Sequence, residues 1–196
     1  MPYLAPTARV LGNACVLDHA CVLDNARVLG TAHVAGNACV FGNAHVTGDA
    51  CISGYAGISD DAHVSGNASV SDTAHVAGDA YIFGDASIFG DAYVSGTARI
   101  SGDARISGSA CISGNARISG DACVYGIKRS DGYCFIYVPC QDGKFHVQAG
   151  CRDFTMRQAR KHWGSPEYPD RKLAKETLVI LDCLEALSKV KPEGAV

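Results

Sequence analysis

Apolar and polar residues repeat with a period of six between Thr7 and Val124. Alanine occupies every sixth position from Ala8 to Ala122, which gives 20 units, and each alanine is followed two positions later by Val or Ile. Residues two apart on a strand point to the same side, so each unit predicts a short strand with these two residues inward and the residue between them outward. A repeat that keeps its phase over 20 units predicts a β-solenoid of one strand and one turn per unit.

The turn positions agree with this prediction. Two residues after each Val or Ile stands Gly in 16 units and Asp in four, at Asp18, Asp24, Asp60 and Asp72. Glycine, and with less ease aspartate, tolerates a positive φ. We therefore expect the backbone to bend sharply at each of these positions.

Runs of the form V-x-G-[ND]-A-x resemble the hexapeptide-repeat proteins. The resemblance implies a mainly β fold: a left-handed parallel β-helix of about 20 hexapeptides, with three per triangular coil and six to seven coils. The periodicity alone predicts only a β-solenoid, and the general preference for crossover connections favours the right hand. The left hand therefore rests on the resemblance.

The period stops after Val124, which predicts a β-helix domain over residues 1–126 and a C-terminal α+β capping or interaction domain over residues 127–196. Residues 1–6 are expected to form an extended lead-in that covers the open end of the first coil. In the second part we expect strands over 133–138 and 145–149, joined through Asp142 and Gly143, a typical hairpin turn.

Two helices are predicted after these strands. Thr155 and Gln158 form a capping-box pattern for a short helix that ends near Trp163. A longer amphipathic helix is predicted from about Asp170 to Val190. The resulting ββαα unit is expected to close the end of the solenoid, where backbone groups otherwise stay unpaired.

Three segments of the tail, IKRSDGY, VQAGCRDFT and ARKHW, resemble a small domain found behind hexapeptide repeats in uncharacterised phage, prophage and bacterial proteins. The resemblance covers roughly residues 127 to 188 and implies no activity. Cys151 with His146 or His162 is a candidate thiol and base pair. A buried structural cysteine after a strand is the favoured explanation of Cys151.

The composition limits the function classes. A net charge of −3 gives no bulk attraction to nucleic acid or to anionic membrane. The chain lacks an apolar run of membrane-spanning length and a signal-peptide pattern at its start, so we predict a cytoplasmic protein, in the host cytoplasm if it is phage-encoded. Its ten cysteines are then expected to be reduced.

Three units per coil would stack residues that are 18 apart, at about 4.8 Å. A strongly basic outward column then contains Arg9, Arg27, His45, His63, Tyr81, Arg99 and Arg117. One interpretation of this binding column is a groove for a phosphate-bearing or acidic partner. The alternative is that Asp85, Asp103 and Asp121, which share a corner column, neutralise it.

The other two outward columns are rich in thiols and imidazoles. They contain Cys15, His33, Cys51, Ser69, Ser87, Arg105 and Cys123, and Cys21, Cys39, Gly57, His75, Tyr93 and Cys111. A straight column does not supply a tetrahedral cage from one chain, and no CxxC pair is present. We therefore predict no metal site and no cofactor. The alternative is a site completed across a subunit interface, which the hexapeptide-repeat resemblance allows because that family includes zinc-dependent carbonic anhydrases.

Outward apolar residues predict interfaces. The candidates are Leu11, Leu17, Leu23 and Leu29 around the first coil, and Tyr81, Phe83, Phe89 and Tyr93 in one later coil. The hexapeptide-repeat resemblance implies side-by-side trimers, so a homo-oligomer, trimer or dimer, is the favoured explanation over a foreign partner.

Two function classes remain. The favoured prediction is a non-catalytic scaffold that binds a macromolecule, most simply a protein, through the C-terminal domain or the exposed columns. The tail resemblance extends this to a phage protein directed at a host defence or nucleic-acid-processing complex. The alternative is an acyltransferase of the hexapeptide superfamily that uses acetyl-coenzyme A or acyl carrier protein, with His45 and His63 as candidate bases. Because the repeat has no insertion between its units, no loop is expected to extend from a coil and enclose an acceptor site. This argues against catalysis.

Overall fold

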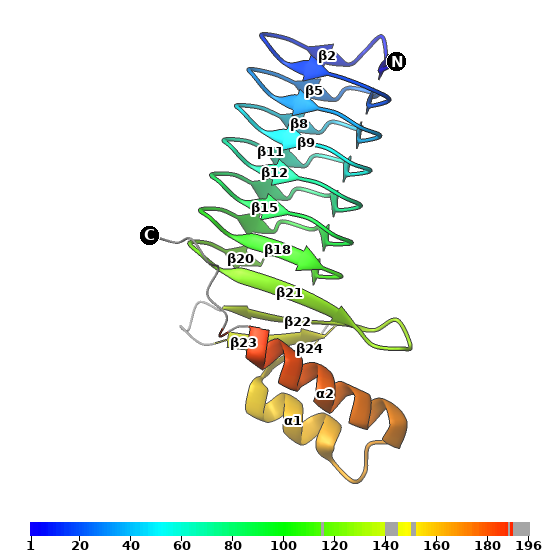
Figure 1. Cartoon of the computed structure of the whole chain (residues 1–196), viewed down its shortest axis with the longest axis vertical. Helices are drawn as coiled ribbons and strands as arrows, with labels where there is room; N and C mark the ends of the chain where they lie inside the picture. The colour runs from blue at the N-terminus through cyan, green and yellow to red at the C-terminus, as the bar shows by residue number, and fades with distance from the viewer. Residues whose placement is uncertain (115, 140–144, 150–151, 188, 190–196) are drawn as a thin grey trace.

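The fold is a solenoid of parallel strands that continues into an antiparallel β-region and two helices (Figure 1). The computed structural model describes residues 1–114, 116–139, 145–149, 152–187 and 189. The solenoid is about seven coils long, because two of its three sheets contain seven strands each. The helices lie at the end opposite the N-terminus (Figure 1).

Each coil contributes one strand to each of three sheets. Sheet A contains β1 (Tyr3–Leu4), β4 (Cys21–Val22), β7 (Cys39–Val40), β10 (Gly57–Ile58), β13 (His75–Val76), β16 (Tyr93–Val94) and β19 (Cys111–Ile112). Sheet B contains β2 (Arg9–Val10), β5 (Arg27–Val28), β8 (His45–Val46), β11 (His63–Val64), β14 (Tyr81–Ile82), β17 (Arg99–Ile100) and β20 (Arg117–Ile118). Sheet C begins with β3 (Cys15–Val16), β6 (His33–Val34), β9 (Cys51–Ile52), β12 (Ser69–Val70), β15 (Ser87–Ile88), β18 (Arg105–Gly108) and β21 (Cys123–Lys128).

Neighbouring strands in a sheet pair in parallel with residues 18 apart as partners, for example His45 with His63 and His63 with Tyr81. The three-unit coil implied by the hexapeptide-repeat resemblance is therefore confirmed, and so is the grouping of outward residues into columns 18 apart. The hand of the solenoid stays a prediction.

The core of the tube consists of the repeated alanines and branched aliphatics. From Ala20 to Ile112 every one of these side chains is fully buried. Stacked side chains of one size at one spacing form continuous apolar ladders, which is the packing that the period predicts.

The backbone bends where the sequence predicts. Each turn-position Gly and Asp has a positive φ except Gly126. Residue 126 lies inside β21, which runs straight on for six residues. Gly126 is required for another reason: a Cβ there would lie 2.0 Å from the backbone nitrogen of Ala110.

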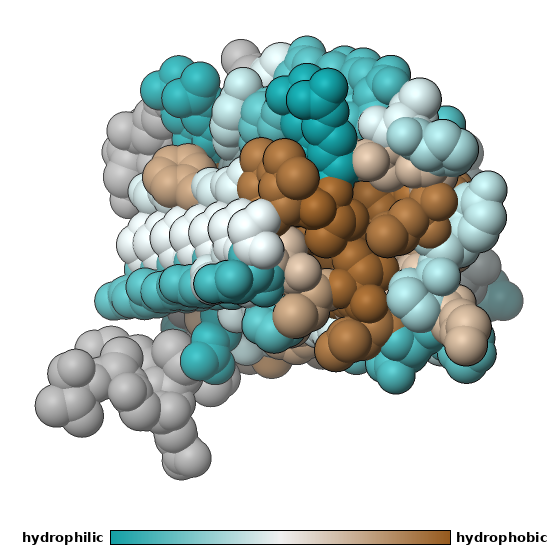
Figure 2. Space-filling model, turned by 90° about the horizontal axis from the view of Figure 1, so that it is seen from above, coloured by the Kyte–Doolittle hydropathy of each residue, from teal (hydrophilic) through white to brown (hydrophobic). Residues whose placement is uncertain are grey.

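The expected lead-in at residues 1–6 is wrong in one respect. Tyr3 and Leu4 form β1, which pairs with β4 in the solenoid register, so they add a further unit to sheet A instead of covering the coil. Leu4 occupies an inward position yet is 48% exposed. Figure 2, seen from this end, shows hydrophobic residues gathered at the surface.

Sheet C continues past the solenoid through three antiparallel strands, β22 (Cys134–Pro139), β23 (Phe145–Ala149) and β24 (Arg152–Thr155). Two of these strands were predicted, whereas β24 was not, so the ββαα expectation is one strand short. β21 spans the predicted boundary between residues 126 and 127. The predicted turn at Asp142 and Gly143 lies outside the described residues.

Two helices follow, α1 (Met156–Gly164) and α2 (Arg171–Leu187). The predicted capping box is confirmed, since the Gln158 amide donates to the Thr155 hydroxyl and the Gln158 side chain accepts from the Thr155 amide. Asp170 Oδ1 accepts from the amides of Lys172 and Leu173 at the start of α2, 2.9 Å from each nitrogen. The predicted end at Val190 lies outside the described residues. No helix within the described ranges is long and apolar enough to cross a membrane.

β22 contributes to two cores at once. Ile136 and Val138 pack into the core of the solenoid, while Phe135, between the sheet and the helices, packs with Trp163 and Leu181. Successive residues of a strand point to opposite faces, so one strand joins the last coil to the helix pair.

Candidate binding column on sheet B

The seven residues of the predicted binding column lie on successive strands of sheet B as direct register partners. The rings of His45 and His63 stack with centroids 4.8 Å apart, and those of His63 and Tyr81 are 4.8 Å apart and nearly parallel, at 2°. The Arg99 guanidinium lies 5.4 Å from the centre of the Tyr81 ring. The column thus has three stacked rings at its middle and two arginines at each end.

Neighbouring charge affects the histidines. Burial is the main cause that lowers the pKa of His45 below its usual 6.5, and the charges of His63 and Arg27 lower it further. The carboxylate of Asp61 acts in the opposite direction. The neutral imidazole of His45 is therefore favoured near pH 7.

The arginines of the column form no ion pair within the part of the chain that the structure describes. No acidic oxygen there lies within 4.0 Å of a nitrogen of Arg9, Arg27, Arg99 or Arg117. Neutralisation by Asp85, Asp103 and Asp121 is not seen as ion pairing, and Asp85 instead accepts a hydrogen bond from Asn67 at 2.8 Å. Guanidinium groups without an ion-pair partner suit carboxylate or phosphate.

A shallow groove of about 460 Å³ runs beside the N-terminal half of the column. Its lining residues are Pro6, Thr7, Ala8, Arg9, Asn25, Arg27 and Asn43. The side-chain amide of Asn25 donates to Asn43 Oδ1 at 3.4 Å. The side-chain amide of Asn43 donates to Asp61 Oδ1 at 3.1 Å. Each of these bonds uses one N–H of the donating side-chain amide and leaves the second N–H for another acceptor.

The leucines predicted as interface residues surround the first coil. Leu11 and Leu17 are 57% and 50% exposed, whereas Leu23 and Leu29 are half-buried. The later aromatic residues lie in one coil, as predicted, but on different faces: Tyr81 on sheet B, Tyr93 on sheet A, and Phe83 and Phe89 directly after β14 and β15. They encircle the tube and do not form one flat patch.

Among the described residues, the prediction of interface residues overlooked four exposed aromatics, of which Phe41 and Tyr55 lie among the repeat units and Tyr3 and Phe145 lie outside them. Phe41 follows β7 at the same outward position as Leu23, one coil earlier, so the leucine pattern was a usable signal. Tyr55 stands where most units carry a small polar residue, which was a second signal.

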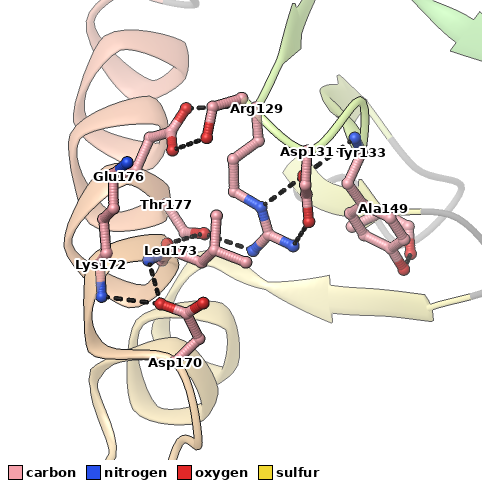
Figure 3. A network of polar contacts seen from close by, with 10 residues as sticks. Arg129, Asp131, Tyr133, Ala149, Asp170, Lys172, Leu173, Glu176 and Thr177 are labelled. Atoms are coloured by element: carbon pink, nitrogen blue, oxygen red, sulfur yellow. Dashed lines mark hydrogen bonds and ion pairs between the residues drawn. The ribbon is translucent and has the colours of Figure 1, made fainter.

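The loop between β21 and β22 is fastened to α2 through a buried arginine (Figure 3). Arg129 makes two bonds to the Asp131 carboxylate, at 3.0 and 2.6 Å, and donates to the Thr177 hydroxyl at 2.9 Å. Its guanidinium also lies over the rings of Tyr133 and Phe135, at 5.3 and 5.4 Å. The hydrogen bonds from Arg129 are the main cause that lowers the pKa of Asp131 to about 2.

The histidines of the tail bind neighbouring side chains. His146 Nδ1 lies 2.9 Å from an Asp153 oxygen, and His162 Nε2 lies 2.9 Å from Arg152 Nη1. The third member of the thiol and base alternative, Cys151, lies outside the described residues.

The path of the solenoid bears on the acyltransferase alternative. From β1 to β19 the strands begin at six-residue intervals without an inserted loop. The candidate bases His45 and His63 are stacked on each other in the binding column.

Comparison with known proteins agrees with the architecture. Residues 98–114 and 110–126 each match the family model of the YdcK beta solenoid repeat, and this stretch contains β17 to β20 and the first four residues of β21. No curated protein matches the chain. The chain is a parallel β-helix built from short sequence repeats, similar over its last solenoid coils to the YdcK beta solenoid repeat.

Proposed function

We propose that the protein is a non-catalytic scaffold that binds an acidic macromolecule along the binding column of sheet B. The observation that carries the proposal is that its four arginines lie in one straight column without an acidic partner among the described residues. Guanidinium groups bind carboxylate and phosphate through directed pairs of hydrogen bonds.

An acidic protein surface is favoured over nucleic acid as the partner. Single-stranded nucleic acid binds by stacking bases on free ring faces, and here the facing sides of His45, His63 and Tyr81 are stacked on each other. The corner that precedes sheet B carries Asp61 and Asp79 beside the column. A duplex, which is anionic across its whole width, would be repelled by these carboxylates.

The experiment is a binding titration with two labelled probes, a polyglutamate peptide and a DNA strand of similar charge. Arg9→Gln with Arg27→Gln is expected to weaken peptide binding at least about tenfold. The matched control, Arg105→Gln with Arg157→Gln, removes two exposed arginines outside the column, on sheet C and α1, and is expected to change affinity by less than about twofold.

Equal losses in the two double variants would reject the column as the binding surface. Tighter binding of DNA than of the peptide, with the same dependence on Arg9 and Arg27, would replace the acidic protein by a nucleic acid.

The further parts of the proposal concern assembly and origin. A homo-oligomer, trimer or dimer, is proposed through the leucine and aromatic residues that surround the tube, and light scattering of the purified chain tests it. A phage origin and a host defence or nucleic-acid-processing target rest on the tail resemblance. Removal of residues 127–196 followed by capture from the native host tests whether the tail is needed for partner recognition.

The acyltransferase alternative is tested with the same preparation. Acetyl-coenzyme A would have to raise the melting temperature by several degrees, and His45→Ala or His63→Ala would have to abolish the rise.

A further inference from the structure

Two thiols lie on neighbouring rungs of sheet A, on a different sheet from the binding column. Cys21 on β4 and Cys39 on β7 are direct register partners, and both side chains are half-buried. Both are free thiols, and the Cys21 Sγ–H donates to the His19 carbonyl at 3.6 Å. The two side chains are therefore partly accessible to solvent, and they extend from adjacent strands on the same face of sheet A.

The other cysteines of the solenoid are not arranged in this way. In sheet C the residue between Cys15 and Cys51 is His33, so those thiols are two rungs apart. Cys111 pairs with Tyr93, and Cys123 pairs with Arg105. Within the described solenoid, Cys21 and Cys39 are the pair of cysteines on adjacent rungs of one column.

The spacing of this pair suits one kind of ligand. A cation bound in a line between two thiolates separates the sulfurs by two metal–sulfur bonds, about 4.6 Å in total for bonds of about 2.3 Å. Adjacent strands hold the backbones of Cys21 and Cys39 about 4.8 Å apart, which lets the two side chains reach that separation. Thiolates select soft ions such as Cu(I).

A tetrahedral ion is not favoured at this place. Zinc needs four ligands that converge from different directions, and no group of three or more His, Cys, Asp or Glu side chains converges among the described residues. A column supplies ligands along one line, which matches two-coordinate geometry.

The next rung of the column carries no side chain of its own. Gly57 is the partner of Cys39, and the imidazole of His75 extends over it from one rung further. A Cβ at residue 57 would lie 2.5 Å from His75 Nδ1. An imidazole nitrogen is thus held over Gly57, on the side of Cys39 that faces away from Cys21.

We propose that Cys21 and Cys39 bind one Cu(I) ion as a two-coordinate bis-thiolate. Each S–H bond breaks and releases its proton to solvent, and each sulfur forms one bond to copper. Copper enters as Cu(I) and its oxidation state does not change. The site is independent of the binding column.

The test is an anaerobic titration of the full chain with Cu(I), in competition with a chromophoric Cu(I) chelator. One tight equivalent is expected. Cys21→Ser with Cys39→Ser is expected to lose it, whereas the matched control, Cys15→Ser with Cys51→Ser, keeps it. Loss of the equivalent in both variants, or in neither, would overturn the assignment.

A second measurement does not depend on the variants folding. In the unmodified chain, one equivalent of Cu(I) is expected to protect Cys21 and Cys39 from alkylation, as read by peptide mass spectrometry, while Cys51 and Cys111 stay reactive. Uniform protection of all exposed cysteines, or none at Cys21 and Cys39, would contradict the proposal.

Discussion

The carboxylate of Asp60 accepts a hydrogen bond from the backbone amide of Gly78, one coil further along, with Oδ2 3.0 Å from the nitrogen. The other three turn aspartates make the same contact, with Gly36, Gly42 and Gly90. All four have a positive φ, which costs free energy for any residue with a Cβ. The hydrogen bond to the next coil offsets that cost.

Asp60→Ala is therefore expected to lower the free energy of unfolding by roughly 2 kcal/mol, because it keeps the unfavourable φ and loses the bond. Asp60→Gly loses the bond but relieves the strain, so its expected cost is below about 1 kcal/mol. Urea unfolding followed by circular dichroism measures both. An alanine variant as stable as the glycine variant would show that the φ at this position costs little.

Gly126 gives a second prediction, on backbone contact. Since a Cβ there would meet the backbone of Ala110 at 2.0 Å, Gly126→Ala is expected to push β21 away from residues 109 and 110. The control is Gly164→Ala, where the added Cβ would meet only the Leu178 side chain, at an ordinary contact distance of 3.9 Å. We expect faster amide exchange at residues 109 to 112 for Gly126→Ala and not for Gly164→Ala, and equal exchange in the two variants would contradict this.

The two faces of β22 should respond separately to truncation. Ile136→Ala opens a cavity at the base of the solenoid core and Phe135→Ala opens one beneath the helices, each at a cost of about 3 kcal/mol. Hydrogen exchange is expected to rise in β18 to β20 for Ile136→Ala, and in α1 and α2 for Phe135→Ala. The same exchange pattern in both variants would mean that the two cores unfold as one unit.

The acid sensitivity of the tail should depend on Asp131. Its pKa in the folded chain, about 2, is below the ordinary value of 3.8, so its stabilising contribution is present above pH 3.8 and is lost as the pH falls through about 2. Fluorescence of Trp163, the one tryptophan, is expected to stay native-like to about pH 3. Asp131→Asn should move the transition to higher pH, and the exposed control Glu167→Gln should not.

Protonation of His45 provides a prediction near neutral pH. Because its pKa lies below 6.5 in the folded chain, its contribution to stability is present above pH 6.5 and is lost as the pH falls through the folded pKa. His63, Arg27 and Asp61 are the charged or titratable groups that act on it. His45→Gln should flatten the decrease in stability between pH 7 and pH 5 in urea unfolding, and an unchanged slope would place the titration elsewhere.

The sequence was sufficient for the repetitive part of the fold. A register of 18 residues fixes which side chains are neighbours, so the column that contains His45, His63 and Tyr81 was predictable before any coordinates. The ring stacking at 4.8 Å follows from that register and from the strand spacing.

The remaining features depend on contacts that a period does not encode. β24 is a four-residue strand with two exposed polar residues, Arg152 and Asp153, so its pattern gives little signal. The imidazole of His75 can lie over residue 57 because that residue, on the adjacent strand of sheet A, is a glycine. Among the described residues, Arg27 and Arg99 form no ion pair, although the turns next to their strands contain acidic residues in the sequence. The reason is the direction of the side chains at these turns, which the period does not encode.

The constant rise of the solenoid fixes the distance between the arginines at the two ends of the binding column. Arg27 and Arg99 are four rungs apart, about 19 Å, and neither end can approach the other because every coil between them is fully packed. On the proposed function, a partner with acidic groups at that separation would engage both ends, whereas one with a shorter separation would reach a single end and the stacked rings. Deleting one whole 18-residue coil between Arg27 and Arg99 would shorten their separation by about 4.8 Å, and the column would then favour partners whose acidic groups lie closer together.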